Sequence, residues 1–211
     1  MSRNLSYTIT ALALAMACLA APSTASAANI VMLQTLMPAP GEANPSGGNI
    51  IASISVPVVS SSYTGLLTST VFENDVSNPF GGLTFTYQLT NDATSTQPIG
   101  RITVNGFAGF QTDASYQTPT TGLPPTMINR PVSDYLGFSF FAGIGPGVLS
   151  PGMTSSVLVI QTDAPAWQPN VGSVINGHIV TVPTLSPVPE PGTLVLLGLG
   201  TVLMVRRRIA R

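Results

Sequence analysis

His178 is the only histidine in this chain of 211 residues, so it would be the only ordinary base for a serine nucleophile. It directly follows the turn pair Asn176-Gly177, and the G-x-S-x-G elbow that would present such a serine does not occur in the sequence. Zinc would have to rely on carboxylates, because the one cysteine, Cys18, lies near the amino terminus. We therefore expect no catalytic residue, no metal and no cofactor, and interpret His178 as an exposed strand residue.

Acidic residues are scattered through the body of the chain. A pair of them could supply the acid and base of a glycosidase, but spacing in sequence does not set the short separation that this chemistry requires. Glu73-Asn74-Asp75 concentrates oxygen ligands of the kind that calcium prefers, although the regular D-x-D-x-D-G loop is missing. We interpret this tripeptide as a solvated turn, and a secreted hydrolase remains a distant alternative.

Trp167 is the single tryptophan, and the prolines at positions 165 and 169 predict a loop around it. With Tyr63, Tyr116 or Tyr135 it could form an aromatic platform for a sugar ring. The other interpretation is a tryptophan that covers one end of the domain. The platform makes a carbohydrate-binding module the alternative function.

Cations are sparse in the body of the chain. Lysine is absent, and between the two ends only Arg101 and Arg130 oppose seven acidic residues. Neutralising nucleic-acid phosphates needs a cluster of cations, so we expect no nucleic-acid partner. Uncharged polar residues dominate a body of roughly 160 residues, which is long enough for one exported domain with a core.

Alternation of apolar and polar residues at 83–90 predicts a β-strand. Leu83, Phe85, Tyr87 and Leu89 would face the core, while the threonines and glutamine between them would meet water. Residues 157–160 have no polar alternation and predict a central strand covered on both faces. Asn176-Gly177 predicts a type I′ hairpin. Further strands are expected at residues 50–59, 66–72, 101–107, 138–144 and 156–162.

Six to nine short strands without a helical repeat predict an all-β fold. We expect a single β-sandwich over residues 28–182, immunoglobulin-like as the first expectation and jelly-roll-like as the second. A first strand is expected around residues 30–33, and loops at 37–48 and 117–125. Residues 183–188 are expected to be a semi-extended linker.

The carboxyl end combines three features in order. Pro189, Glu190 and Pro191 come first, an apolar run without ionisable side chains occupies residues 193–205, and Arg206, Arg207 and Arg208 follow. As a helix the run would span roughly 20 Å of a hydrocarbon core about 30 Å thick, so snorkelling arginines would have to complete the crossing. The arginines would remain on the cytoplasmic side.

These residues, with the glycine- and leucine-rich segment 192–200, resemble the PEP-CTERM sorting domain of Gram-negative, biofilm-forming bacteria. The resemblance covers about residues 188–211. It implies recognition by an exosortase, a membrane-embedded cysteine peptidase that cleaves near the motif and passes the protein toward the envelope surface or extracellular matrix. Segment 189–211 would then be a sorting segment with a transmembrane helix, held transiently in the inner membrane. The body is similar to exported β-rich proteins with such tails, a likeness that brings no known activity.

The amino terminus predicts export as well. Arg3, the apolar stretch 9–21 and Ala25-Ser26-Ala27 form a signal peptide, residues 1–27, for the Sec translocon and signal peptidase, with the cut after Ala27. Cys18 would suit a lipoprotein, but the leucine expected three positions before a lipidated cysteine is missing. Cys18 would thus be lost with the signal.

The sequence therefore predicts a non-enzymatic, exported protein of the cell surface or extracellular matrix. Its expected role is structural or adhesive in biofilm or exopolysaccharide.

Overall fold

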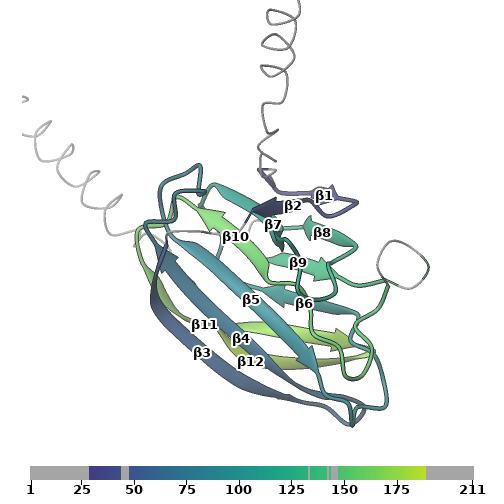
Figure 1. Cartoon of the computed structure of the whole chain (residues 1–211). Coiled ribbons are helices and arrows are strands. Elements are labelled where there is room, and N and C mark those ends of the chain that lie inside the picture. The colour runs from purple at the N-terminus through teal and green to yellow at the C-terminus, as the bar shows by residue number, and fades with distance from the viewer. Residues whose placement is uncertain (1–28, 44–47, 133, 142, 144–146, 189–211) are drawn as a thin grey trace, which may run out of the picture.

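The computed structural model describes residues 29–43, 48–132, 134–141, 143 and 147–188. Within these ranges the chain forms twelve strands and no helix (Figure 1). Sheet A has the order β2 (Gly41–Ala43), β7 (Thr112–Thr118), β10 (Leu158–Thr162), β5 (Thr84–Asn91), β4 (Thr64–Glu73), β3 (Asn49–Val59). Sheet B has the order β1 (Gln34–Leu36), β8 (Met127–Arg130), β9 (Leu136–Ser139), β6 (Arg101–Val104), β11 (Trp167–Asn176), β12 (His178–Pro187). The all-β prediction is confirmed, with more strands than the six to nine expected.

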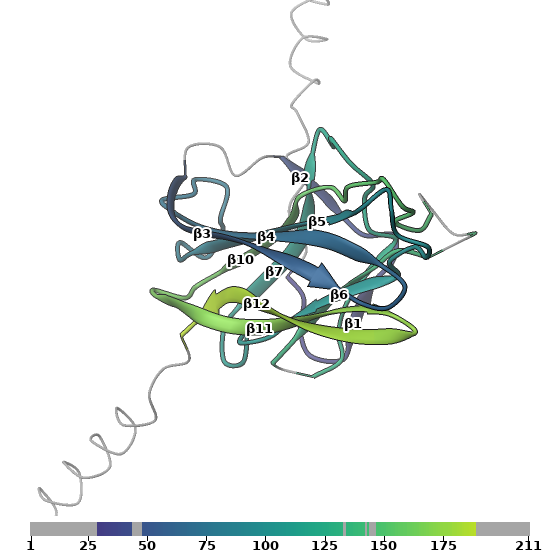
Figure 2. The same cartoon turned by 90° about the horizontal axis from the view of Figure 1, so that it is seen from below.

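All neighbouring strands are antiparallel except β2 and β7, which are parallel. Figure 2 shows the two sheets as layers, with β3, β4 and β5 in one and β11 and β12 in the other. Their facing side chains form one hydrophobic cluster. Because each sheet buries one face against the other, neither needs a helix to cover that face.

Residues on β4 and β5 connect the two sheets. The Phe85 ring of β5 meets the edge of the Phe107 ring, which follows β6, with centroids 5.8 Å apart and an interplanar angle of 85°. The Tyr87 hydroxyl donates to the Leu185 carbonyl oxygen of β12 at 2.6 Å. The Leu185 amide in turn donates to the Ser69 hydroxyl of β4 at 3.1 Å. Apolar packing and buried hydrogen bonds therefore fix β12 against sheet A.

The strand predicted at 83–90 is confirmed as β5, and Phe85, Tyr87 and Leu89 are fully buried. The expectation that the intervening threonines meet water is wrong, since Thr84 is 0% and Thr86 6% exposed. The chain after β4 covers this outer face, where the Thr84 hydroxyl donates to Asp75 Oδ2 at 2.6 Å. The central strand β10 is buried along its whole length. Its apolar run predicts this for residues 158–160, while Gln161 and Thr162 are buried although they are polar.

Several boundaries differ from the sequence prediction. Residues 37–48, expected as a loop, contain β2, and the first strand begins at Gln34 rather than at Ile30. Strands β7 and β8 were not predicted, and β6 and β9 end earlier than residues 107 and 144. In β7 only Ala114 and Tyr116 are apolar, so its alternation is short and weak, and pairing with β10 and β2 decides its conformation.

The β11–β12 hairpin is confirmed, but its predicted type I′ turn is wrong. Ile175 pairs with Ile179 and Asn176 with His178, so the turn centres on Gly177. Gly177 has φ +67°, whereas Asn176 is not among the residues with positive φ. A type I′ turn needs positive φ at two consecutive residues, and this turn has an odd number of residues instead.

The linker predicted at 183–188 is also wrong for most of its length, because β12 continues to Pro187. Thr184 and Ser186 are fully buried and Leu185 is 2% exposed. Trp167, expected in a loop, opens β11 and pairs with Pro187. The fold thus extends to the carboxyl edge of the described residues. The predicted signal peptide and transmembrane helix lie outside them, and within them no helix has the length and apolarity to cross a membrane.

Candidate functional site

The end of β12 is the place where the described chain reaches the predicted sorting residues. The Val188 amide donates to the Ala166 carbonyl oxygen at 3.1 Å, and Pro187 pairs with Trp167. These contacts hold this end of β12 against β11. Pro189, Glu190 and Pro191 follow at once, and they lie outside the described residues, as do Arg206, Arg207, Arg208, Ala25 and Ala27. The motif therefore begins beside a packed strand.

A groove of about 700 Å³ opens where β3 faces β11 and β12. Ala52, Ile54 and Val56 of β3 lie on one side, and Trp167, Pro183 and Leu185 lie on the other. The three β3 side chains are only half-buried, although they pack against the core. On the neighbouring strand β4, Leu67 and Val71 are fully buried. The core is thus covered over β4 and left open over β3.

The aromatic platform expected from Trp167 and a tyrosine is not assembled. Tyr63 is 1% exposed, and its hydroxyl donates to the carbonyl oxygens of Val174 at 2.9 Å and His178 at 3.2 Å. Tyr116 lies on β7, at the other side of sheet A, and Tyr135 precedes β9 in sheet B. None of the three lines the groove, where Trp167 lies beside prolines instead.

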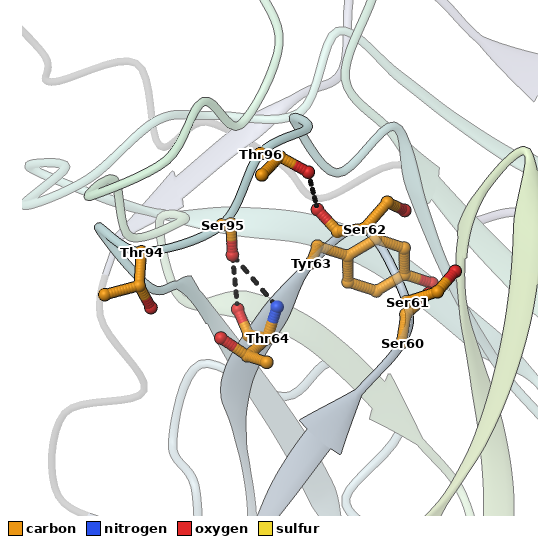
Figure 3. Close-up of a pocket in the computed structure, with 8 residues that line it drawn as sticks. All are labelled: Ser60, Ser61, Ser62, Tyr63, Thr64, Thr94, Ser95 and Thr96. Atoms are coloured by element: carbon orange, nitrogen blue, oxygen red, sulfur yellow. Dashed lines mark hydrogen bonds between the residues drawn. The ribbon is translucent and has the colours of Figure 1, made fainter.

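A second, smaller pocket of about 130 Å³ lies at the β3–β4 turn and is lined by hydroxyl side chains of residues 60–64 and 94–96 (Figure 3). The Ser95 hydroxyl donates to the Thr64 carbonyl oxygen at 3.0 Å and accepts from the Thr64 amide at 2.9 Å. The Thr96 hydroxyl donates to the Ser62 carbonyl oxygen at 2.9 Å. These hydroxyls hold two turns together. The His178 side chain, exposed on β12 as predicted, does not line the pocket.

An acidic cluster on the outer face of sheet A was missed by the sequence analysis. Glu42 of β2 and Asp113 of β7 are 5% and 2% exposed, and Gln161 of β10 is 1% exposed. The Ser115 hydroxyl donates to Glu42 Oε2 at 2.7 Å. Asp113 Oδ1 and Gln161 Oε1 are buried without a hydrogen-bond partner among the described residues.

Burial raises the pKa of Asp113 to about 7, and the nearby Glu42 carboxylate raises it further while the Ala114 amide opposes the shift. Burial also raises the pKa of Glu42, against the hydrogen bond from Ser115. Two carboxyl groups in one dry site disfavour double ionisation, so one of them retains a proton well above the usual range.

Asp75 joins the same network, which corrects the interpretation of residues 73–75 as a solvated turn. Asn74 does turn the chain, with φ +56°. However, Asp75 is 6% exposed, and its Oδ1 accepts from the Ser77 hydroxyl at 2.7 Å. Gln161 Nε2 donates to Ser77 Oγ at 2.8 Å and to Asp75 Oδ2 at 3.3 Å. Within the described ranges, no three or more His, Cys, Asp and Glu side chains are grouped so that they could hold a metal ion.

The two arginines of the body make internal hydrogen bonds. Arg101 donates to Ser139 Oγ at 2.7 Å and to Asn129 Oδ1 at 2.6 Å. Arg130 donates to the carbonyl oxygens of Ile30 at 3.0 Å and Phe107 at 2.6 Å. Both guanidinium groups therefore support sheet B and the segments beside it.

The family described as the PEP-CTERM protein-sorting motif matches residues 187–208, which start at the last residue of β12. No curated protein and no solved structure matches the chain. The chain thus carries a PEP-CTERM protein-sorting motif directly behind its β domain, as an exported protein sorted through an exosortase does.

Proposed function

We propose that this protein is a non-enzymatic β-sandwich that an exosortase-type peptidase releases from the inner membrane to the cell surface or extracellular matrix. There it serves as a structural or adhesive component of biofilm or exopolysaccharide. The observation that carries the proposal is the sorting motif at residues 187–208, placed directly after β12. Before release, the apolar run at 193–205 and the three arginines behind it anchor the chain in the membrane.

The position of the motif sets a requirement for the peptidase. Glu190 is the second residue after Val188, so about 7 Å of extended chain separates it from the last hydrogen bond of the β domain. A membrane enzyme must therefore accept a folded domain close to its active site, or the end of β12 must open locally. Because so little chain separates the motif from the β domain, cleavage after folding would depend on the shape of the domain.

The outer face of sheet A supports a role in contact with hydrated polymers. Hydroxyl pairs join β3 to β4, with Ser53 and Thr70 at 3.0 Å and Ser55 and Thr68 at 2.9 Å. Such rows of uncharged polar side chains allow an edge strand to face water, although the body of the chain has few charged residues. A carbohydrate-binding module is the second candidate, favoured by the half-buried Trp167 in the groove.

Glu190→Ala is expected to leave the protein uncut while the apolar run still holds it in the membrane. Fractionation with a tag in the β domain should show wild type as a cleaved surface or secreted form, and the variant at full length in the inner membrane. Deleting Arg206, Arg207 and Arg208 should instead weaken membrane retention and orientation, because these charges hold the carboxyl end inside.

Glu73→Ala is the matched control for Glu190→Ala, since it removes an exposed acid from the end of β4 and should be processed like wild type. Processing of Glu190→Ala at the wild-type rate, in a strain that carries the enzyme, would reduce the tail to a simple anchor and refute the sorting proposal.

The mature amino terminus is expected at Ala28, because Ala25 and Ala27 fit the small-residue positions before a signal peptidase cut. Amino-terminal sequencing of the envelope or secreted form checks this prediction. Detection of Met1, or of a lipid on Cys18, would show that another export route operates.

A further inference from the structure

We propose that, in the uncut chain outside a membrane, the apolar segment 193–205 folds back and occupies the groove between β3 and β12. The proposal concerns the protein before its tail is cut, so it does not depend on the exosortase.

The groove is an incomplete part of the core. Ala52, Ile54 and Val56 point to the same side of β3 as the fully buried Val58, yet all three are only half-buried. Strand β12 is the last strand of sheet B, so no further strand of that sheet covers them. Half-buried apolar side chains of this kind are stabilised when an apolar segment covers them.

Backbone groups along the groove are also available. β3 pairs only with β4, and β12 pairs only with β11. Each strand therefore presents one edge without a sheet partner among the described residues, and an extended segment could hydrogen-bond there. The edges and the apolar lining together suit a strand-like apolar peptide.

The tail starts at the correct place to be that peptide. Trp167, which lines the groove, pairs with Pro187, so the chain leaves β12 at the end of the groove. Pro189, Pro191 and Gly192 are residues that favour reversal of the chain. The groove runs along residues 51–56 of β3, which span about 20 Å, and six or so extended residues would fill that length.

Composition favours the same occupant. No charged side chain lines the groove, and segment 193–205 has no ionisable side chain. Outside a membrane this segment would otherwise expose a continuous apolar surface to water. Docking would remove both the apolar lining of the groove and the apolar surface of the tail from contact with water.

Trp167 makes the proposal directly measurable, because it is the only tryptophan in the chain. The experiment uses the uncut protein from Ala28 to Arg211 in dilute, detergent-free buffer and measures acrylamide quenching of tryptophan fluorescence. Leu197→Asp places a charge in the tail and leaves the β domain unchanged, and it should raise the quenching constant by at least about two-fold if the tail covers Trp167. Vesicles of phosphatidylethanolamine and phosphatidylglycerol should raise quenching in the wild type by drawing the tail into lipid.

Substitutions on β3 provide the matched pair. Ile54→Asp, on the groove side, should release the tail, whereas Val59→Asp, on the opposite face of the same strand and outside the groove, should not. Near-ultraviolet circular dichroism checks that both variants fold. If Ile54→Asp does not fold, the Leu197→Asp variant still tests the proposal.

Three results would overturn the proposal. Equal quenching of wild type and Leu197→Asp would show that the tail does not cover Trp167. Protection that disappears on dilution would identify a second copy as the occupant. Protection produced by soluble exopolysaccharide equally in wild type and Leu197→Asp would assign the groove to carbohydrate instead.

Discussion

Phe85→Ala is expected to lower the free energy of unfolding by about 3 to 5 kcal/mol, the range for removing a fully buried aromatic side chain. Phe85 is 0% exposed on the central strand β5, and its ring contacts Phe107, which follows β6 of the opposite sheet, at a centroid distance of 5.8 Å. The substitution removes both the transferred apolar area and an edge-to-face contact between the sheets. Urea denaturation of the β domain measures the loss.

Thr86→Ala is the neighbouring control on the other face of β5. Although Thr86 is only 6% exposed, its replacement removes a few atoms and no aromatic contact, so about 1 kcal/mol or less is expected. Losses of similar size in the two variants would mean that Phe85 does not face the common core. The register of β5 against β4 and β10 would then be wrong.

Local patterns in the sequence predict the strands whose own residues carry the signal. Phe85, Tyr87 and Leu89 alternate with polar residues, and residues 157–160 form an unbroken apolar run, so β5 and β10 could be placed without knowing their neighbours. Strands β2 and β7 could not be placed in this way. Their polar side chains are buried because other segments cover them, as Ser115 and Glu42 cover each other.

Proline misled the interpretation of residues 183–187. Pro183 and Pro187 suggest an extended linker, yet both lie on the last strand of a sheet, where a missing amide donor is tolerated at the unpaired edge. The buried Leu185 between them shows that the segment is part of the fold. The carboxyl-terminal motif could be recognised from sequence alone, since its three parts follow one another in the chain and need no tertiary contact.

Residues that come together only in the folded chain could not be recognised. Glu42 and Asp113 lie on β2 and β7, far apart in sequence, and nothing near either residue indicates that it is buried. The groove is similarly made by strands near opposite ends of the domain, β3 and β12. Trp167 lies in the groove with the proline and leucine of β12, and not with the tyrosines that the sequence suggested as its partners.

The β domain is expected to be less stable at pH 8 than at pH 5, because Asp113 binds its proton more tightly when folded. Burial raises the pKa of Asp113 from 3.8 to about 7. A folded pKa above the unfolded value contributes stability that is complete below the unfolded pKa and is lost as the pH rises through the folded pKa. The loss should therefore begin near the unfolded pKa of 3.8 and end near the folded pKa of about 7, so the part measured above pH 5 lies between pH 5 and pH 7. Urea denaturation at pH 5, 6, 7 and 8 should show a total change on the order of 1 to 2 kcal/mol. This total is below the limit of about 1.4 kcal/mol for each of the two pH units between pH 5 and pH 7, because solvent screens part of the interaction.

Asp113→Asn tests whether this carboxyl group is the cause. The amide cannot ionise, so the variant should lose much of the pH dependence and be at least as stable as wild type at pH 8. Some dependence should remain, because burial also raises the pKa of Glu42 and acts with the same sign. Glu73→Gln removes an exposed acid of the same sheet and should follow the wild-type curve. A wild-type domain that becomes more stable from pH 5 to pH 8 would show that Asp113 is ionised in the folded state, with a cation or a rearranged β2 stabilising its charge.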